Sequence, residues 1–278
     1  MKLQAALLRL AKGGPEQRAV EAGEIDAVVD YASSNVILLP AARRALANRK
    51  AADKAPPANG LLAALPRQDY QRLLPDLEPV VLSCGETLHE PGARIRDVYF
   101  PLDSQVCLLM VERGKAIEVG LVGLEGMVGM ALALGGEESP VRALVQGTGT
   151  ALRMKANVFH EALAGCPSLQ RELNRYACAK LLQARQTAAC NRFHQVEGRL
   201  ARWLLMTQDR VRSGRFRLTH EFLAEVLGVR RVGVTEAASR LQRDKLISYR
   251  RGEIRILDRD GLRAAACPCY DVVRKLAG

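Results

Sequence analysis

With 278 residues, of which 48% are hydrophobic, the chain can bury one large core or two ordinary ones, which excludes a disordered protein. Its formal net charge of +11 implies an acidic partner, either nucleic acid or an anionic membrane. The charge is concentrated at one end: from Asn191 onward there are 19 Lys and Arg residues against 10 Asp and Glu, a net of +9. A localised basic segment favours DNA.

The sequence carries no sign of a membrane segment. Its apolar stretch from Leu3 to Leu10 is interrupted by Arg9 and falls short of the roughly 18 residues of a membrane span, so we interpret it as a helix and not as a signal peptide. The seven cysteines are odd in number and widely spaced, which suits a reducing compartment. We therefore expect a cytoplasmic protein without membrane contacts.

The first boundary lies at residues 51–60, which are rich in Ala, Pro and Gly and lack apolar periodicity. Residues 1–58 are therefore predicted to be an N-terminal extension and linker. They contain short helical patterns, such as residues 40–48, and apolar runs at residues 26–30 and 36–39 that fit either strands or helix pieces. Nothing in this segment indicates a chemistry.

Residues 61–163 are predicted to form a β-rich domain. A helical pattern at residues 66–74 precedes a series of short β-rich runs, which are separated by Gly-containing turns. The runs lie at residues 80–84, 98–101, 106–111, 116–122, 141–145 and 150–154. Many short strands at this spacing are typical of a sandwich or a jelly roll.

A long helix is predicted at residues 167–190, because Pro167 and Ser168 open a stretch with no Gly or Pro before Gly198 and Ser168 is a plausible N-cap. One side of it carries a stripe at three- and four-residue steps: Leu169, Leu173, Tyr176, Lys180, Gln183 and Thr187. An ordinary core-facing helix would show the same stripe. We prefer a helix–helix dimer seam, because the helix is longer than average and joins a β domain to a basic domain.

After a further predicted helix at residues 196–211, the chain has the pattern of a helix-turn-helix. Thr219 can cap the first helix, Gly228 permits a tight turn, and the second helix begins near Arg230. The predicted buried side of the second helix is Val234, Ala237, Ala238 and Leu241, and its predicted outer side is Arg231, Thr235, Glu236, Arg240 and Arg243. Two short β patterns around the basic residues 250–252 then predict a wing.

A helix of this kind fits the major groove, where its early residues reach base edges while flanking cations neutralise phosphates. A helical hairpin with a solvated charged face is the alternative. The ordered combination of cap, Gly turn, basic helix and basic wing favours DNA binding. The predicted DNA contacts are Thr219, His220, Arg230, Arg231, Val232, Thr235, Glu236, Arg240, Arg250 and Arg251.

Over roughly residues 61–262 the sequence resembles regulators of the Crp/Fnr type, the family to which the catabolite activator protein belongs. The segments that carry the resemblance are Gly126-Met-Val-Gly129, Val196-Glu-Gly-Arg-Leu-Ala201, residues 218–234 and residues 251–256. The resemblance implies an α+β fold: a β-roll sensor domain at residues 61–163, a dimerisation helix at 167–190 and a winged helix-turn-helix domain at 191–278. It also implies a homodimer on a palindromic operator in double-stranded DNA, with RNA polymerase as a further partner.

The resemblance places the family's first specificity Arg on Arg231, which can recognise guanine through two hydrogen bonds. The neighbouring acidic position falls on Val232 and the second Arg on Glu236, and neither matches the family pattern. Glu236 can accept from cytosine or orient Arg240 four residues later. We therefore expect an operator half-site that differs from the best-known family consensus.

The resemblance further implies a cyclic-nucleotide pocket that has degenerated. Such a pocket needs backbone donors, a cation for the phosphate and an acceptor for the ribose hydroxyl. The corresponding positions are Gly129, which is kept, and Met130, Val141, Arg142, Ala184 and Arg185, which depart from the family's residues. A one-residue slip would place Arg142 in the Arg role but would still leave no ribose acceptor. We expect no control by cyclic AMP, predict no cofactor and leave the effector open.

Other classes of function have weaker support in the residues. Cys267 and Cys269 supply only half of a Cys₄ site, so no metal site is predicted, although a redox- or haem-sensing regulator is an alternative with His89, His160 and His194 as uncommitted ligands. No enzyme is expected, since the sequence has no zincin helix, nucleophile elbow or phosphate loop. A cyclic-nucleotide-like module acting through a protein partner is a third hypothesis, but it needs no basic recognition helix.

Overall fold

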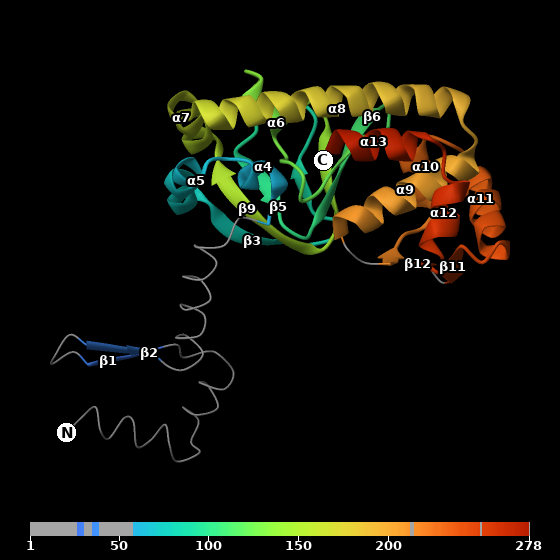
Figure 1. The fold of residues 1–278 in the computed structure, drawn as a ribbon, viewed down its shortest axis with the longest axis horizontal. Helices are drawn as coiled ribbons and strands as arrows, with labels where there is room; N and C mark the ends of the chain where they lie inside the picture. Colours follow the sequence, from blue (N-terminus) through green and yellow to red (C-terminus); the bar gives the residue numbers. More distant parts are fainter. Residues whose placement is uncertain (1–26, 31–34, 39–57, 212–213, 251, 278) are drawn as a thin grey trace, which may run out of the picture. The chain divides into compact units, whose positions relative to one another are not determined.

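The computed structural model describes residues 27–30, 35–38, 58–211, 214–250 and 252–277. The chain divides into two units, residues 1–57 and 58–278. In the first unit, strands β1 (Ala27–Asp30) and β2 (Asn35–Leu38) pair as an antiparallel hairpin, which resolves the two ambiguous apolar runs as strands (Figure 1). The helical pattern predicted at residues 40–48 lies outside the described residues.

The second unit begins with α4 (Gly60–Ala63), α5 (Arg67–Leu73) and the short 3₁₀ helix η1 (Leu74–Asp76). Two antiparallel sheets follow. One has the order β3 (Glu78–Leu82), β9 (Gly149–Lys155), β5 (Asp97–Pro101). The other has the order β4 (Thr87–His89), β8 (Arg142–Gly147), β6 (Gln105–Glu112), β7 (Lys115–Val122).

These sheets form the predicted β-roll. A buried cluster that includes Leu82 and Ala151 from the first sheet and Val106 and Val145 from the second joins the two, because strands that alternate apolar and polar side chains bury one face. Each of the six predicted β runs overlaps a strand. The prediction missed β4, whose three residues are too short to show an alternating pattern.

Three helices share a buried cluster with the β-roll: α6 (Met130–Ala133), α7 (Ala156–Gly165) and α8 (Pro167–Phe193). The 27-residue α8 runs along one side of the unit (Figure 1). The predicted cap at Ser168 is wrong. The helix starts one residue earlier, at Pro167, and the Ser168 hydroxyl donates instead to Oδ2 of Asp69 at 2.6 Å.

The dimer seam predicted on α8 is also wrong, because the predicted stripe faces the chain's own interior. Leu169, Leu173 and Tyr176 pack in a buried cluster with residues of the β-roll, and Gln183 is buried as well. Lys180 and Thr187 are half-buried, and Lys180 donates to the Leu121 carbonyl oxygen at 2.6 Å. The stripe is therefore the core-facing side of an ordinary amphipathic helix.

The C-terminal part of the unit is built around α9 (Val196–Val211), α10 (His220–Leu227) and α11 (Arg231–Arg243). Strands β10 (Arg215–Arg217), β12 (Glu253–Ile256) and β11 (Ile247–Arg250) form a sheet in that order. Helices α12 (Arg259–Ala265) and α13 (Cys269–Ala277) follow, and α13 packs against α8 (Figure 1). Strand β10 and helices α12 and α13 are not among the elements predicted from the sequence.

The β-roll and the C-terminal part share one core. Leu109 and Leu121 of the β-roll belong to the same buried cluster as Trp203 and Leu204 of α9. Glu118 of β7 is buried at this junction, where it accepts hydrogen bonds from Trp203 Nε1 at 2.8 Å and from Cys107 Sγ at 2.9 Å. Within the described part of the chain, no helix has the length and apolar character that crossing a bilayer requires.

Candidate DNA-binding interface

The turn between α10 and α11 has the predicted cap and the predicted glycine. Thr219 Oγ1 accepts from the Phe222 amide at 3.1 Å, which satisfies an otherwise unpaired donor at the start of α10. Gly228 ends α10 in the left-handed region at φ 60°, where a side chain is strained. A Cβ at this position would also approach Cδ1 of Ile117 to 2.6 Å. These contacts fix the angle at which α11 leaves the turn.

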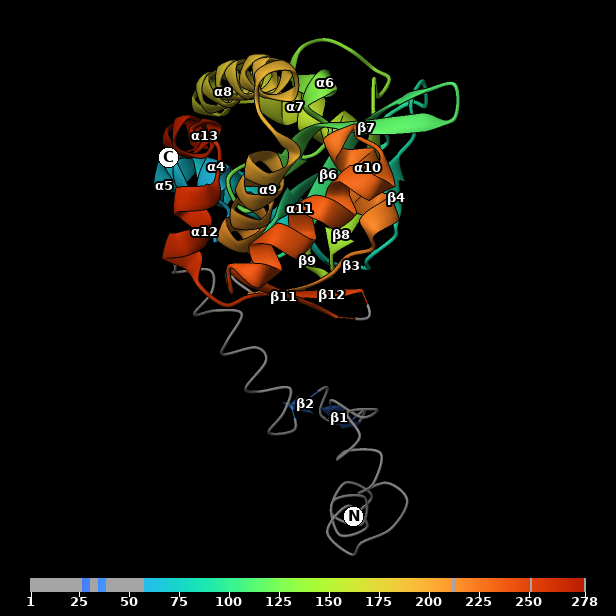
Figure 2. The ribbon, with the colours of Figure 1, turned by 90° about the vertical axis from the view of Figure 1, so that its right-hand side faces the viewer.

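Helix α11 buries one face and exposes the other, as predicted. Its inner residues Val234, Ala237, Ala238 and Leu241 are at most 3% exposed and hold the helix on the core. The exposed outer positions include Arg231, Val232, Thr235, Glu236, Arg240 and Arg243, and Arg230 stands exposed at the N-cap. Figure 2 shows α11 at the surface beside the hairpin of β11 and β12. The predicted recognition residues therefore share one accessible face.

His220 is less available than the sequence predicts. Its ring stacks on Tyr249 of the wing with 4.3 Å between centroids, and its Nδ1 is hydrogen-bonded to Thr235 Oγ1 at 3.0 Å. Burial, and then the charge of Arg231, lower the pKa of His220, so the ring is neutral near pH 7. His220 thus joins α10, α11 and the wing.

The alternative in which Glu236 orients Arg240 is wrong. Arg240 Nη1 lies 3.5 Å from Glu197 Oε2 of α9, so it is held by another helix. Among the described residues, Glu236 makes no ion pair within 4.0 Å and is exposed on the outer face. Its carboxylate is accessible to a partner.

The wing adds a basic groove beside α10. Arg250 at the end of β11 is exposed, whereas Arg251 lies outside the described residues. A surface groove of about 880 Å³ is lined by Arg215, Arg250 and Arg255 together with Thr219. Arg215 and Arg255 are not among the DNA contacts predicted from the sequence. The alternation Arg-Phe-Arg at residues 215–217 was the available signal, but β10 is only three residues long.

We expect Arg250→Ala to weaken DNA binding about equally for all sequences, because an exposed wing cation that meets phosphate carries no base information. The slope of log affinity against log salt should fall by about one. Fluorescence anisotropy over a salt series, with an operator and a random duplex, measures both quantities. If Arg250→Ala weakened binding to the operator but not to the random duplex, Arg250 would instead contact the bases.

The structure places the positions of the predicted degenerate pocket at the start of α6, at the start of β8 and on α8. Gly129 keeps a left-handed backbone at φ 96°, but the space above it is filled, since a Cβ there would meet Val98 Cγ1 at 2.9 Å. Met130 is half-buried against the core. Val141 is half-buried too, and Arg142 Nε donates to Glu90 Oε2 at 2.9 Å.

The remaining two pocket positions, Ala184 and Arg185, lie exposed on the outer face of α8. His89, considered above as a haem ligand, is buried, and its Nε2 donates to the Asp97 carbonyl oxygen at 2.9 Å. Burial lowers the pKa of His89. Its ring is therefore engaged in the packing near Gly129.

The comparisons with known proteins agree with this geometry. Residues 198–265 match the Crp-like helix-turn-helix domain family. Similar solved structures include FixK2 from Bradyrhizobium japonicum, with a TM-score of 0.58 and 15% identity over 69% of this chain and 98% of that chain. No curated protein sequence matches the chain.

Two further structures have comparable similarity. The c-di-GMP-responsive global regulator CLP from Xanthomonas campestris has a TM-score of 0.56 and 17% identity over 69% of this chain and 99% of that chain. A CRP/FNR-family transcriptional regulator from Thermus thermophilus has a TM-score of 0.57 and 24% identity over 68% of this chain and 98% of that chain. The predicted α+β fold class is confirmed, and the chain carries a Crp-like helix-turn-helix domain within the fold of Crp/Fnr-family transcriptional regulators.

Proposed function

We propose that the protein is a sequence-specific, homodimeric transcription regulator that reads a palindromic operator and meets RNA polymerase at its promoters. The observation that carries the proposal is the two-sided α11, whose inner residues are fully buried while Arg231, Thr235 and Glu236 are exposed on the outer face. The basic groove of the wing lies next to it and is suited to the phosphate backbone.

Arg231 carries base recognition in this proposal. It is the first residue of α11, it is exposed, and the early residues of a recognition helix reach the base edges. Val232 beside it is 60% exposed and offers only an apolar contact, such as one with a thymine methyl group. Glu236 lies on the same face and can accept from the amino group of cytosine.

We expect Arg231→Ala to weaken operator binding by about 1–3 kcal/mol, or roughly 5- to 150-fold, and to relax base preference at one position of each half-site. Arg231→Lys is the matched control, since it keeps the charge but loses the two-pronged hydrogen bonding to guanine. Binding assays against all single-base operator variants measure both effects. A uniform loss with rescue by Lys would show that Arg231 contacts phosphate only.

Selection of binding sites from random double-stranded DNA tests the function as a whole. A dimer with two-fold symmetry predicts an enriched palindrome whose half-sites are about one helical turn apart, roughly 10–10.5 base pairs. Failure to enrich any palindrome would contradict the proposal.

The outer face of α8 is the proposed dimer surface. It exposes three large apolar side chains, Leu181 (52%), Leu182 (39%) and Phe193 (76%). Exposed positions recur along it at the three- and four-residue steps of a helix–helix contact: Arg171, Arg175, Cys178, Leu182, Arg185, Ala189 and Arg192. The small side chain of Ala189 allows two such helices to approach closely.

We expect that cyclic AMP does not control this protein. Arg142 is paired with Glu90, and neither Met130 nor Val141 offers a charge or a ribose acceptor. Losing two charge-assisted hydrogen bonds, at about 1.5–3 kcal/mol each, implies at least about a hundredfold weaker binding. Calorimetric titration with cyclic AMP and cyclic GMP measures this, and micromolar binding that changes DNA affinity would contradict the prediction.

A further inference from the structure

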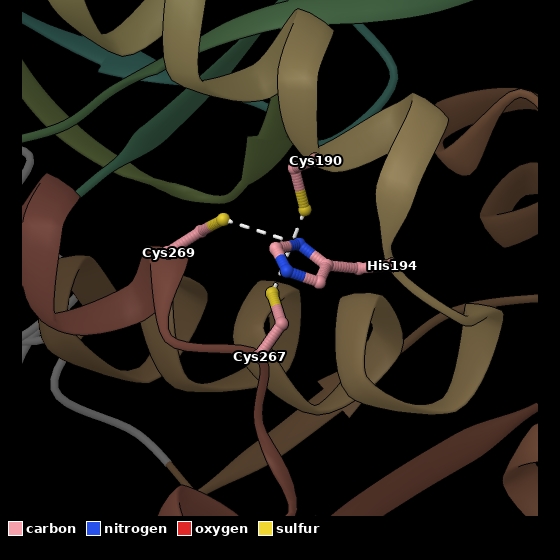
Figure 3. Close-up of side chains that lie close together, drawn as sticks. All are labelled: Cys190, His194, Cys267 and Cys269. Atoms are coloured by element: carbon pink, nitrogen blue, oxygen red, sulfur yellow. Dashed lines mark hydrogen bonds between the residues drawn. The ribbon is translucent and has the colours of Figure 1, made fainter.

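Three cysteines and a histidine from distant parts of the second unit meet at one buried point (Figure 3). Cys190 lies in the last turn of α8 and His194 is the residue that follows this helix, while Cys267 precedes Pro268 and Cys269 begins α13. The candidate ligand atoms of all four lie within 4.8 Å of one another. The three cysteines are at most 7% exposed.

The spacing of the four ligand atoms suits a single metal ion. With metal–sulfur bonds of about 2.3 Å and metal–nitrogen bonds of about 2.0–2.1 Å, ligand atoms of a tetrahedral zinc site lie about 3.5–3.8 Å apart. The sulfur atoms of Cys190 and Cys267 are 3.5 Å apart, and Cys269 Sγ lies 3.4 Å from His194 Nδ1. An iron–sulfur cluster needs wider spacing, because each ligand binds a different iron.

We propose that Cys190, His194, Cys267 and Cys269 bind one structural Zn²⁺ ion. Three thiolates and one imidazole form one of the common ligand sets of closed zinc sites. Soft sulfur ligands exclude Mg²⁺ and Ca²⁺, which take oxygen. On binding, the cysteine thiols give up their protons to solvent and form three zinc–sulfur bonds, and a neutral imidazole nitrogen completes the site.

Local structure brings each ligand into position. His194 caps the C-terminal end of α8, where its amide donates to the Cys190 carbonyl oxygen at 3.1 Å and keeps the two residues together. The Cys267 amide donates to the Gly198 carbonyl oxygen at 3.1 Å, and a Cβ on Gly198 would approach that amide nitrogen to 3.2 Å. The glycine thus lets the segment with Cys267 lie directly on α9.

The charges around the cluster also fit. Three thiolates and Zn²⁺ carry a net charge of −1, and two buried arginines of α9, Arg199 (5% exposed) and Arg202 (4%), interact electrostatically with the Cys190 and Cys267 thiols. Neither arginine makes an ion pair within 4.0 Å in the part of the chain that the structure describes, and the Nε atom of each is buried without a hydrogen-bond partner there. An anionic metal centre beside them compensates these buried charges.

A side chain next to the cluster donates a hydrogen bond to one of the proposed ligands. Gln186, one turn before Cys190 on α8, donates from Nε2 to Cys269 Sγ at 3.0 Å. Hydrogen bonds of this kind orient metal ligands, and their loss typically weakens metal binding by about 10- to 100-fold. The metal ion would link the C-terminal end of α8 to the start of α13.

Metal analysis of the full-length protein, purified under reducing conditions, tests the proposal. We expect about one zinc per chain by mass spectrometry of the metal content. Cys267→Ser/Cys269→Ser should lose the zinc, Gln186→Ala should bind Zn²⁺ about 10- to 100-fold more weakly in a chelator competition, and both should keep a native circular dichroism spectrum in the β region. The exposed cysteines provide matched controls, because Cys84→Ser and Cys178→Ser should retain the metal.

A second measurement uses the wild-type chain alone and does not depend on how the variants fold. Zinc is removed with a chelator and replaced by Co²⁺, which should give the strong visible bands of a tetrahedral, thiolate-rich site, and added Zn²⁺ should displace it and raise Tm. Iron in place of zinc, a Cys190–Cys267 disulfide in the reduced preparation, or apoprotein that binds neither Zn²⁺ nor Co²⁺ would each overturn the assignment.

Discussion

Replacing both Leu181 and Leu182 by Glu is expected to convert the protein into a monomer and to remove high-affinity operator binding. Both side chains are exposed on the outer face of α8, where four introduced carboxylates per dimer would have to be desolvated against one another. A dimer binds its second half-site as an intramolecular step, which is worth roughly 10²- to 10⁴-fold in affinity. The monomeric variant should therefore bind the operator about 10²- to 10⁴-fold more weakly than the wild-type dimer.

Sedimentation and operator titration of the same preparations check this expectation. Val81→Glu is the matched control, because Val81 is a 71% exposed apolar residue on β3 and does not belong to the proposed dimer surface on α8, so the dimer should persist. Leu173→Glu is informative in a different way. Its side chain is fully buried within the chain, so this variant should unfold instead of forming a native monomer. An unchanged dimer in the double variant would move the interface to another surface.

The error in the predicted seam shows what helical periodicity can and cannot decide. The pattern of Leu169, Leu173 and Tyr176 correctly identifies one side of α8 as buried. It does not reveal whether the covering surface belongs to the same chain or to a second copy, since both bury apolar groups equally well. Leu181 and Leu182 are neighbours in sequence and break the stripe, which was the available sign of a second apolar surface.

The helix-turn-helix could be predicted closely because its signals are local. Thr219, Gly228 and the alternation of buried and exposed residues on α11 act over a few residues each, and the structure confirms them. Helices α12 and α13 were missed because they are short, and α12 carries Gly261 in its middle. Their place is set by packing on α9 and α8, which the sequence does not display.

The proposed metal ligands could not be predicted from the sequence for the same reason, because distant parts of the chain bring them together. Cys267 and Cys269 are recognisable as a pair, but the other half of the set lies at Cys190 and His194, more than 70 residues earlier. A Cys followed four residues later by a His at the end of a helix was the only local hint. The two halves become one site only because α13 packs against α8.

A second large effect is expected at Glu125, which connects the β-roll to α8 and α9. Its Oε1 accepts from Arg210 Nε at 3.0 Å and lies 2.9 Å from Arg210 Nη2 and 3.3 Å from Lys180 Nζ. Burial acts to raise the pKa of Glu125, but the charges of Arg210 and Lys180 outweigh it and lower the pKa to about 2. The carboxylate is therefore the shared counter-charge of two cations from different helices.

Glu125→Gln is expected to lower the free energy of unfolding by about 2–4 kcal/mol at pH 7, because it leaves two cations without their carboxylate in a largely buried setting. Denaturant titration measures the loss. Glu90→Gln is the matched control: its ion pair with Arg142 is half exposed, so its loss should stay below about 1 kcal/mol.

The difference in free energy of unfolding between wild type and Glu125→Gln should depend on pH. This dependence shows how much of the difference comes from the charge of the Glu125 carboxylate and how much from the shape of the side chain. A carboxyl group whose pKa falls from 4.5 to about 2 on folding stabilises the folded state fully above about pH 5, and the stabilisation is lost as the pH falls toward 2. The difference in free energy of unfolding between wild type and Glu125→Gln should therefore decrease steadily as the pH falls from 5 to 2. Buried Glu118, whose pKa burial raises, is present in both proteins and cancels in the comparison. A gap that stays constant across this range would mean that Glu125 contributes through packing and hydrogen bonding alone.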